Sequence, residues 1–521
     1  MPHPQSLDQR VRELAQGEPD ALAYITQASR LSWAEYDARA EALAREIAVL
    51  DFAPGARIAV LLPDGPAVHV AFLAIEKAGC VIVGVGARSG MSELEYLLRL
   101  TGCTGLISGS EHQGTATAEV VRELRARGLD LRDHLIVDSE TGTSLEGSRA
   151  PRTAAISAKP EPRGSNAPFL LNSTSGTTGM PKCVIHDQQR WFAFHRFAVE
   201  AGALSDADIF MSVVPAPFGF GIWTAHVTPT LLGIPTVLMS RFDADAGLEL
   251  IERDRVTVLA AVSTQFIMML SSEKMKNCDF SSLRVLFTGG EAVPHDRAAA
   301  FEDQTGARVL QFYGSNEVGA VSRSTLDDSR EKRLTTAGRV IDEMNVRLFD
   351  DQGQDVTQSG RGQPGCKGPT LSGGYYGDSE ANASLIREDG WMMLGDIVEI
   401  DEEGYLRVVG RTDDFILRGG KNISAVAVEE QVGSHPAVVQ VGVVAMPDAV
   451  FGERVCAFVE LRAGATLDLE MLREHLSERG VSKESFPEHL IVLDSLPRAA
   501  GGKLAKAELR ARVARDSSAS D

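Results

Sequence analysis

One short stretch of the chain carries groups that suit an anion. Residues 173–182 read STSGTTGMPK, in which hydroxyl side chains alternate with glycines and Lys182 closes the run. Successive backbone N–H groups of such a loop can curl around an anion, and a lysine supplies a mobile positive charge for a polyphosphate. The alternative is an ordinary surface turn. The stretch is not a Walker A loop, because only two residues separate Gly176 from Gly179.

Four further motifs follow in a fixed order. They are QFYGSNE (311–317), WMMLGD (391–396), GRTDD (410–414) and PRAAGGK (497–503). With the glycine-rich stretch, they resemble the adenylate-forming superfamily, which includes acyl- and aryl-CoA synthetases, carrier-protein adenylation domains and firefly luciferase. The resemblance runs from about residue 31 to residue 510 and is nearest to the acid–CoA ligases.

The resemblance implies a two-domain α/β architecture. A large N-terminal domain of layered sheets and helices, residues 1–411, would bind ATP and the acid. A small α+β domain, residues 412–521, would carry the catalytic lysine and the thiol-acceptor face. Asp413 occupies the hinge position of the family.

The resemblance also assigns a nucleotide site. The loop would hold the β- and γ-phosphates of ATP, Asp396 and Arg411 would bind the ribose, and two further elements would sandwich the adenine. Gly419 and Gly420 would lie beside the pantetheine of coenzyme A. The remaining residues assigned to the nucleotide are Thr174, Ser175, Gly176, Thr177, Thr178, Gly179, Gly289, Gly290, Glu291, Phe312, Tyr313, Gly314 and Asn316.

Three residues receive catalytic roles by the same resemblance. Lys503 would stabilise the negative charge that develops when a carboxylate attacks the α-phosphorus. Glu317 would hold Mg²⁺, which prefers oxygen ligands, and Lys182 would bind phosphate. A surface charge is the alternative for Glu317, and a flexible tail is the alternative for Lys503.

The sequence departs from the family pattern at several positions. Cys183 follows Lys182 where glycine is usual, and we expect it to be a packing residue rather than a nucleophile. Asn316 replaces a threonine, and its amide could still donate to the α-phosphate. Leu394 replaces another threonine, two residues before Asp396. Ala425 and Ala427 replace residues of a P-x-E-I-E motif that keeps Glu429.

The expected acyl pocket follows Pro215. This segment has no aspartate for a substrate ammonium, and Phe218-Gly219 stands where hydroxybenzoate-activating members have His-Asn. We therefore expect an apolar pocket for an aromatic, alicyclic or medium-sized acid. Hydrophobic core is the alternative for each aromatic residue taken alone. The pocket residues would be Phe218, Gly219, Phe220, Trp223, Phe312 and Val318.

These assignments predict an AMP-forming acid–thiol ligase that uses ATP, Mg²⁺ and coenzyme A. One alternative is a stand-alone adenylase that loads the phosphopantetheine of a carrier protein. Another is a catalytically silent nucleotide-binding homologue, although Glu317, Asp396 and Lys503 are all present. The sequence leaves the acid, the acceptor and the oligomeric state open, including a homodimer.

Composition limits the classes further. The chain has 521 residues, of which 44% are hydrophobic and 24% charged, as in a globular protein of more than one domain. Its net charge of −20 argues against a nucleic-acid partner. We expect no membrane span and no apolar signal segment. The six cysteines form no C-x-x-C pair, which favours reduced thiols in a cytoplasmic protein.

Alternating strands and helices should position the motifs. Ser32 and Glu35 form a capping-box pattern before an amphipathic helix that reaches Leu50. A strand at 57–63, a helix at 69–79 and a strand at 80–86 follow, and the pattern returns at 250–262, 282–290 and 307–314. This alternation predicts parallel β-α-β layers. Short strands and two helices, 468–479 and 504–514, follow Arg411.

Overall fold

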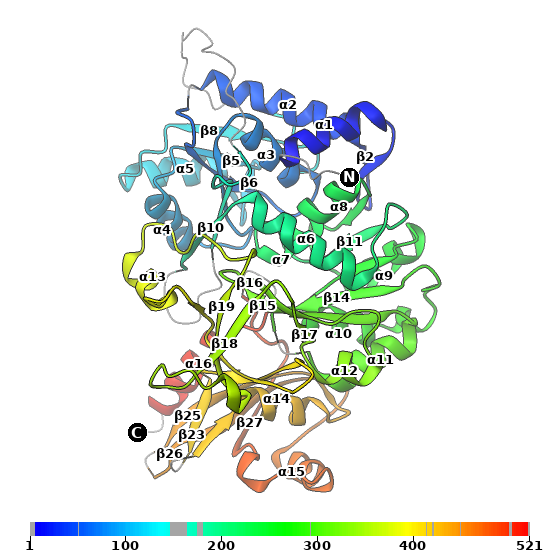
Figure 1. Ribbon diagram of the computed structural model, residues 1–521, viewed down its shortest axis with the longest axis vertical. Helices are drawn as coiled ribbons and strands as arrows, with labels where there is room; N and C mark the ends of the chain where they lie inside the picture. Colours follow the sequence, from blue (N-terminus) through cyan, green and yellow to red (C-terminus); the bar gives the residue numbers. More distant parts are fainter. Residues whose placement is uncertain are drawn as a thin grey trace.

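The computed structural model describes residues 6–50, 52–145, 164–173, 181–291, 293–412, 414–418, 421–448, 450–499 and 503–518. It confirms the α/β class, with a large N-terminal domain and a small C-terminal domain (Figure 1). No helix in these ranges is both long enough and apolar enough to cross a bilayer.

A nine-stranded sheet lies at the centre of the N-terminal domain. Its order is β17-β16-β15-β14-β13-β11-β12-β1-β2, with parallel pairs from β15 through to β1 and antiparallel pairs at the two ends. The strands are β1 (Leu22–Ile25), β2 (Arg30–Ser32), β11 (Phe210–Ser212), β12 (Thr236–Leu238), β13 (Val258–Ala260), β14 (Val285–Gly289), β15 (Arg308–Ser315), β16 (Gly319–Arg323) and β17 (Arg339–Val340).

A six-stranded sheet forms the second layer. Its order is β10-β9-β4-β3-β5-β8, and only the β9–β10 pair is antiparallel. In sequence, the glycine-rich stretch lies between β9 and β10, and its residues 174–180 are outside the described ranges. The strands are β3 (Arg57–Leu61), β4 (Val81–Gly84), β5 (Gly105–Ser108), β8 (Asp133–Ile136), β9 (Leu170–Ser173) and β10 (Cys183–His186).

Helices cover these sheets, and the predicted capping box is present. The Ser32 hydroxyl accepts from the Glu35 N–H at 3.3 Å, and the Glu35 carboxylate accepts from the Ser32 N–H at 2.9 Å. The main helices are α1 (Leu7–Gly17), α2 (Trp33–Val49), α3 (Pro66–Lys77), α4 (Met91–Thr101), α5 (Thr117–Ala126), α6 (Gln188–Gly202), α9 (Ala244–Arg253), α10 (Ser263–Ser271) and α11 (His295–Thr305).

The segment expected to line the acyl pocket is helical but irregular. It comprises the single turn α7 (Gly219–Gly221), a π-helix over Ile222–Val227 and the short helix α8 (Thr228–Leu232). π-Helical turns are rare and occur often at functional sites. The sequence analysis did not predict this one.

An antiparallel sheet, also not predicted, connects the layers to the C-terminal domain. Its order is β18-β19-β21-β22, with β20 paired to β19. Its strands are β18 (Asn345–Phe349), β19 (Arg361–Lys367), β20 (Met392–Met393), β21 (Asp396–Ile400) and β22 (Leu406–Arg411). The helix α12 (Arg330–Thr335) precedes the sheet in sequence, and the helix α13 (Ser379–Leu385) lies between β19 and β20.

The C-terminal domain has its own sheet and its own hydrophobic clusters. The order β24-β23-β26-β25, with β27 paired to β26, forms the sheet. Two clusters of buried residues between Ile416 and Val513 pack around it. The elements are β23 (Phe415–Arg418), β24 (Lys421–Ser424), α14 (Ala425–Gly433), β25 (Val438–Asp448), β26 (Gly452–Leu461), α15 (Leu469–Glu478), β27 (His489–Leu493) and α16 (Lys506–Ser518).

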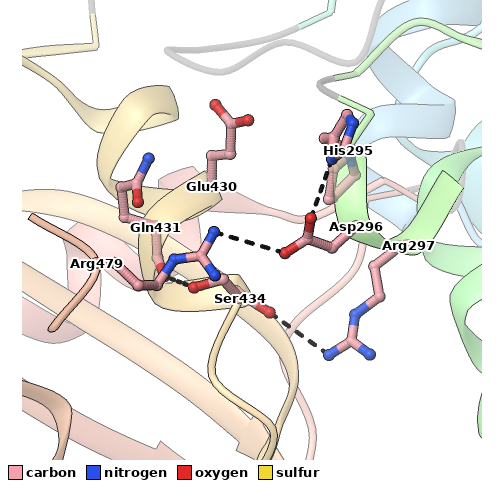
Figure 2. A pocket seen from close by; sticks show the side chains of 9 residues that line it. His295, Asp296, Arg297, Glu430, Gln431, Ser434 and Arg479 are labelled. Carbon is pink, nitrogen blue, oxygen red and sulfur yellow. Dashed lines mark hydrogen bonds and ion pairs between the residues drawn. The ribbon is translucent and has the colours of Figure 1, made fainter. Parts of the chain in front are cut away.

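The two domains meet where α11 faces α14. Arg297 of α11 donates to the carbonyl oxygen of Val438 at 2.5 Å and to that of Gly433 at 3.5 Å. Figure 2 shows Arg297 beside a pocket, together with Asp296 and Arg479, whose charged atoms lie 3.7 Å apart. The Arg297 contacts hold the C-terminal domain in the arrangement of Figure 1.

This contact predicts a difference between two arginine substitutions. Hydrogen bonds from a charged donor contribute about 1.5–3 kcal/mol, whereas an exposed ion pair contributes roughly 0–1 kcal/mol. Arg297→Ala should therefore increase the radius of gyration measured by small-angle X-ray scattering, and Arg479→Ala should change it little. Equal scattering from the wild type and from Arg297→Ala would contradict this role.

Candidate active site

Two adjacent parallel strands bring the expected adenine-binding residues together. β14 and β15 pair so that Gly289 lies opposite Phe312. A Cβ atom on Gly289, where φ is 158°, would lie 2.2 Å from the carbonyl oxygen of Phe312. Only glycine fits this close approach, which leaves a flat backbone surface at the carboxyl edge of the sheet.

Lys503 reaches this edge from the C-terminal domain. A Cβ atom on Gly290 would lie 2.9 Å from the Lys503 Nζ atom. Burial lowers the pKa of Lys503, and the nearby carboxylate of Glu291 opposes that shift most strongly among its neighbours. The Lys503 ammonium therefore lies beside residues that the sequence assigns to the nucleotide, and its catalytic role stays a prediction.

Asp396, Arg411 and Tyr313 form the expected ribose side. Asp396 and Arg411 are direct partners across the antiparallel pair of β21 and β22. The Tyr313 hydroxyl donates to Asp396 Oδ2 at 2.8 Å. Burial raises the pKa of Asp396, and the hydroxyl of Tyr313 and the charge of Arg411 oppose this rise. The carboxylate is thus held in place with a second oxygen for ribose hydroxyls.

Glu317 belongs to a second group that includes a residue the sequence analysis missed. The Tyr375 hydroxyl donates to Glu317 Oε1 at 2.9 Å. The Lys182 ammonium lies 4.8 Å from the centre of the Tyr375 ring, a cation–π distance. Tyr375 therefore connects the two residues expected at the phosphates. The only signal for it in the sequence is the turn SGGYYG at 372–377, between the strands β19 and β20 of the third sheet.

The departures from the family pattern have structural explanations. One Asn316 amide N–H donates to Asn172 Oδ1 at 2.6 Å, so its predicted contact with the α-phosphate would have to use the other N–H. Cys183 is buried in β10, and burial raises the pKa of its thiol to about 12. This confirms that Cys183 is a packing residue. Leu394 is buried as well. Gly314 lies beside Gly319, whose carbonyl oxygen excludes any Cβ.

The expected acyl-pocket residues lie within a cluster of aromatic rings. Trp223 contacts Phe220, Phe312 and Phe194 at centroid distances of 5.3, 5.1 and 4.7 Å. Trp223, Phe312 and Val318 belong to the main hydrophobic core, as the alternative for the aromatic positions expected, and their place in an acyl pocket stays a prediction. Phe194 of α6 and Phe287 of β14 complete the cluster, and neither was predicted.

Gly219 lies against a different pair of side chains. A Cβ atom on it would lie 2.8 Å from Asn316 Oδ1 and 3.4 Å from the Trp191 ring. A larger residue here would displace Asn316. Phe218, the residue before it, is partly exposed. Other sequence predictions fall outside the described residues: Thr174, Ser175, Gly176, Thr177, Thr178, Gly179, Asp413, Gly419 and Gly420.

These residues fit ATP and magnesium. The close approach at Gly289 leaves room for a flat base, and an ammonium and a carboxylate follow where phosphate and ribose would lie. Among the described residues, no three His, Cys, Asp or Glu side chains gather into a metal site. The single carboxylate of Glu317 is enough for Mg²⁺, because this ion keeps several waters and binds through one or two carboxylates together with phosphate oxygens.

Known proteins share this organisation over the whole chain. A medium-chain fatty-acid–CoA ligase of Escherichia coli is 30% identical over 97% of this chain and 90% of its own. An indoleacetate–CoA ligase of Aromatoleum aromaticum is 30% identical over 96% of each chain. A salicyl-AMP ligase / salicyl-S-ArCP synthetase of Mycobacterium tuberculosis is 31% identical over 96% of this chain and 89% of its own.

A solved structure supports the fold. The anthranilate CoA ligase AuaEII in complex with anthranoyl-AMP superposes with a TM-score of 0.87 at 21% identity, covering 98% of each chain. Family models match as well: the AMP-binding enzyme model covers residues 11–376, and the AMP-binding enzyme C-terminal domain model covers residues 427–503. These relatives confirm the predicted enzyme class, an AMP-forming acid–thiol ligase. The chain belongs to the AMP-binding enzyme family.

Proposed function

We propose that this enzyme activates an apolar carboxylic acid with ATP as the acyl adenylate and then transfers the acyl group to coenzyme A. One observation carries the proposal. Lys503 comes from the C-terminal domain, yet its ammonium lies against Gly290 of the N-terminal domain and near carboxylates of that domain. A buried lysine placed across a domain contact requires an anionic partner, which the phosphates and the acid would supply.

In the first half-reaction, a carboxylate oxygen of the acid attacks the α-phosphorus of ATP, and pyrophosphate leaves. Negative charge grows on the phosphoryl oxygens while the acid approaches. Lys503 stabilises both anions because its ammonium is already in place and shielded from water. Mg²⁺ at Glu317 would neutralise charge on the outgoing phosphates.

Other residues hold the nucleotide during this step. Asp396 and Arg411 bind the ribose, and Tyr313 orients Asp396 through its hydroxyl while its ring lies at the adenine. Lys182 contacts the phosphates from the end of the glycine-rich stretch. Tyr375 keeps Lys182 and Glu317 a fixed distance apart, which sets the separation between cation and magnesium ligand.

The aromatic cluster favours an apolar acid. The rings of Trp223, Phe220 and Phe312 present faces and edges but no charged group, so an acyl chain or ring gains by burial against them. Relatives act on a medium-chain fatty acid and on indoleacetate. We infer an aromatic, alicyclic or medium-sized acid.

In the second half-reaction, the thiol of coenzyme A attacks the acyl carbonyl and AMP leaves. Lys503 has no task in this step. We propose that the unit beyond residue 411 rotates about Asp413, withdraws Lys503 and presents Gly419 and Gly420 to the pantetheine. Among the described residues, those buried between 416 and 513 form hydrophobic clusters that include no buried residue of the N-terminal domain, which supports rotation of the C-terminal domain as one body. A carrier protein is the second candidate acceptor, because the salicyl-S-ArCP synthetase is 31% identical.

Removing the Lys503 ammonium should separate the two half-reactions. Lys503→Ala should slow acyl-adenylate formation by about 10²–10³-fold, because a preorganised charge is lost from the transition state. Transfer from a chemically supplied acyl adenylate to coenzyme A should continue. Pyrophosphate release measures the first step, and thioester formation measures the second. Lys483→Ala, at an exposed lysine of the same domain, is the control. Equal losses in both steps would contradict the assignment.

A methyl group on Gly290 should displace the same ammonium. Gly290 has φ 78° and lies against Lys503, whereas Gly306 has φ 74° and no atom within 4 Å of an added Cβ. Both alanine variants pay a similar backbone strain. Only Gly290→Ala should slow pyrophosphate release, by up to about 10²-fold, since small misplacements of a catalytic group cost that much. Equal rates for the two variants would show that Lys503 does not act there.

The acid and the acceptor can be tested together. A panel containing octanoate, indole-3-acetate, benzoate and several amino acids should give acid-dependent AMP release only with the apolar members. Coenzyme A should saturate the reaction without any protein acceptor. Saturation by a phosphopantetheinylated carrier alone would replace the first candidate acceptor with the second, and AMP release with no acid of the panel would refute the proposed substrate class.

A further inference from the structure

A buried arginine lies behind the candidate active site and contacts no substrate position directly. Arg190 of α6 is 2% exposed. Its guanidinium donates to the carbonyl oxygens of Thr370 at 2.9 Å, Asn316 at 3.1 Å and Glu317 at 3.4 Å. It also donates to His186 Nδ1 at 2.6 Å. The guanidinium of Arg190 therefore fixes the backbone of Asn316 and Glu317 through several hydrogen bonds.

His186 continues the chain of hydrogen bonds. It ends β10 and is fully buried, and its Nε2 lies 2.7 Å from Asn172 Oδ1. Because Arg190 can only donate, His186 Nδ1 must accept, and the ring proton must sit on Nε2. That proton is then donated to Asn172. The arginine thus selects the tautomer of the histidine, and the histidine orients the amide of Asn172.

Asn172 joins three segments that are far apart in sequence. It lies in β9, two residues before the glycine-rich run of Thr174–Gly179. Its amide N–H donates to the carbonyl oxygen of Pro217, at the start of the acyl-pocket segment, at 3.0 Å. Its oxygen accepts from the Asn316 amide at 2.6 Å. One fully buried side chain on the strand that precedes the expected phosphate loop therefore connects this strand with the acid segment and with the residue before Glu317.

We propose that Arg190, His186 and Asn172 are positioning residues that align the strand β9, the acid segment at Pro217 and Asn316–Glu317 for adenylate formation. This inference rests on the proposed function. None of the three side chains would touch a substrate; each acts by fixing a group that does. A buried guanidinium that contacts carbonyl oxygens and an imidazole is costly to stability, and such local costs are typical of functional sites.

A pair of substitutions at His186 tests the network. His186→Leu removes both hydrogen bonds, whereas His186→Gln offers an amide oxygen to Arg190 and an amide N–H to Asn172. His186→Leu should slow pyrophosphate release by about 10–100-fold, as losses behind a metal or phosphate site do. His186→Gln should restore most of that rate. The substrate is octanoate or indole-3-acetate, whichever the wild type activates faster.

Two further measurements separate positioning from folding. Thioester formation from supplied acyl adenylate should remain near the wild-type rate in both variants, and calorimetric titration should show weaker MgATP binding for His186→Leu than for His186→Gln. If His186→Leu does not fold, Asn172→Ala can replace it. This variant removes the amide that contacts His186, Pro217 and Asn316 without adding bulk, and it should show the same selective loss of adenylate formation.

The outcomes discriminate clearly. Selective loss of adenylation with rescue by glutamine supports the network. Equal loss in both half-reactions, no rescue by glutamine in a stably folded variant, or full activity of both His186→Leu and Asn172→Ala would overturn it. A wild-type enzyme that forms no adenylate with any acid would instead refute the proposed function.

Discussion

The central constraint on the structure is that the ammonium of Lys503, a residue of the C-terminal domain, is buried against the N-terminal domain. Lys503 lies against Gly290, near Glu291, and burial lowers its pKa. A lone buried charge is unfavourable, so its position has to be maintained by contacts elsewhere. The hydrogen bonds from Arg297 to the backbone of Gly433 and Val438 supply part of that restraint. The same contacts must break if the domain is to rotate.

The N-terminal domain provides the complementary surface through strand ends. Parallel β14 and β15 finish at the same edge, and the tight approach of Gly289 to the carbonyl oxygen of Phe312 excludes a side chain at position 289. Polar groups then enter from separate elements: Asp396 from the third sheet, Tyr375 from the turn between β19 and β20, and Lys182 from the residue before β10. Buried hydrogen bonds behind this surface, from Arg190 through His186 to Asn172, join the pieces.

Much of this arrangement could be predicted from sequence, because the motifs are local. The capping box of Ser32 and the strand that ends at Gly289 each follow from a few adjacent residues, and the role expected of Lys503 comes from a motif shared with the family. The missed features are long-range. Asn172 meets Asn316 across 144 positions, and Tyr375 meets Glu317 across 58, without any periodic pattern to indicate either contact. Phe194 was missed because its helix α6 carries four aromatic residues, a pattern that ordinary core packing also produces. The third sheet was missed because its strands are separated by turns and carry few continuous apolar runs.

The most direct test of this account is to lock the domains in the arrangement of Figure 1 and measure both half-reactions. Asp296 and Arg479 already meet across the contact and are both exposed. Cysteines at these two positions, joined by a short reducible cross-linker, should leave acyl-adenylate formation intact and stop transfer to coenzyme A until the link is reduced. Each variant that carries only one of the two added cysteines should keep its activity in both half-reactions after treatment with the cross-linker. A cross-linked enzyme that forms no adenylate, or that still completes the thioester, would contradict the assignment of this arrangement to the first step.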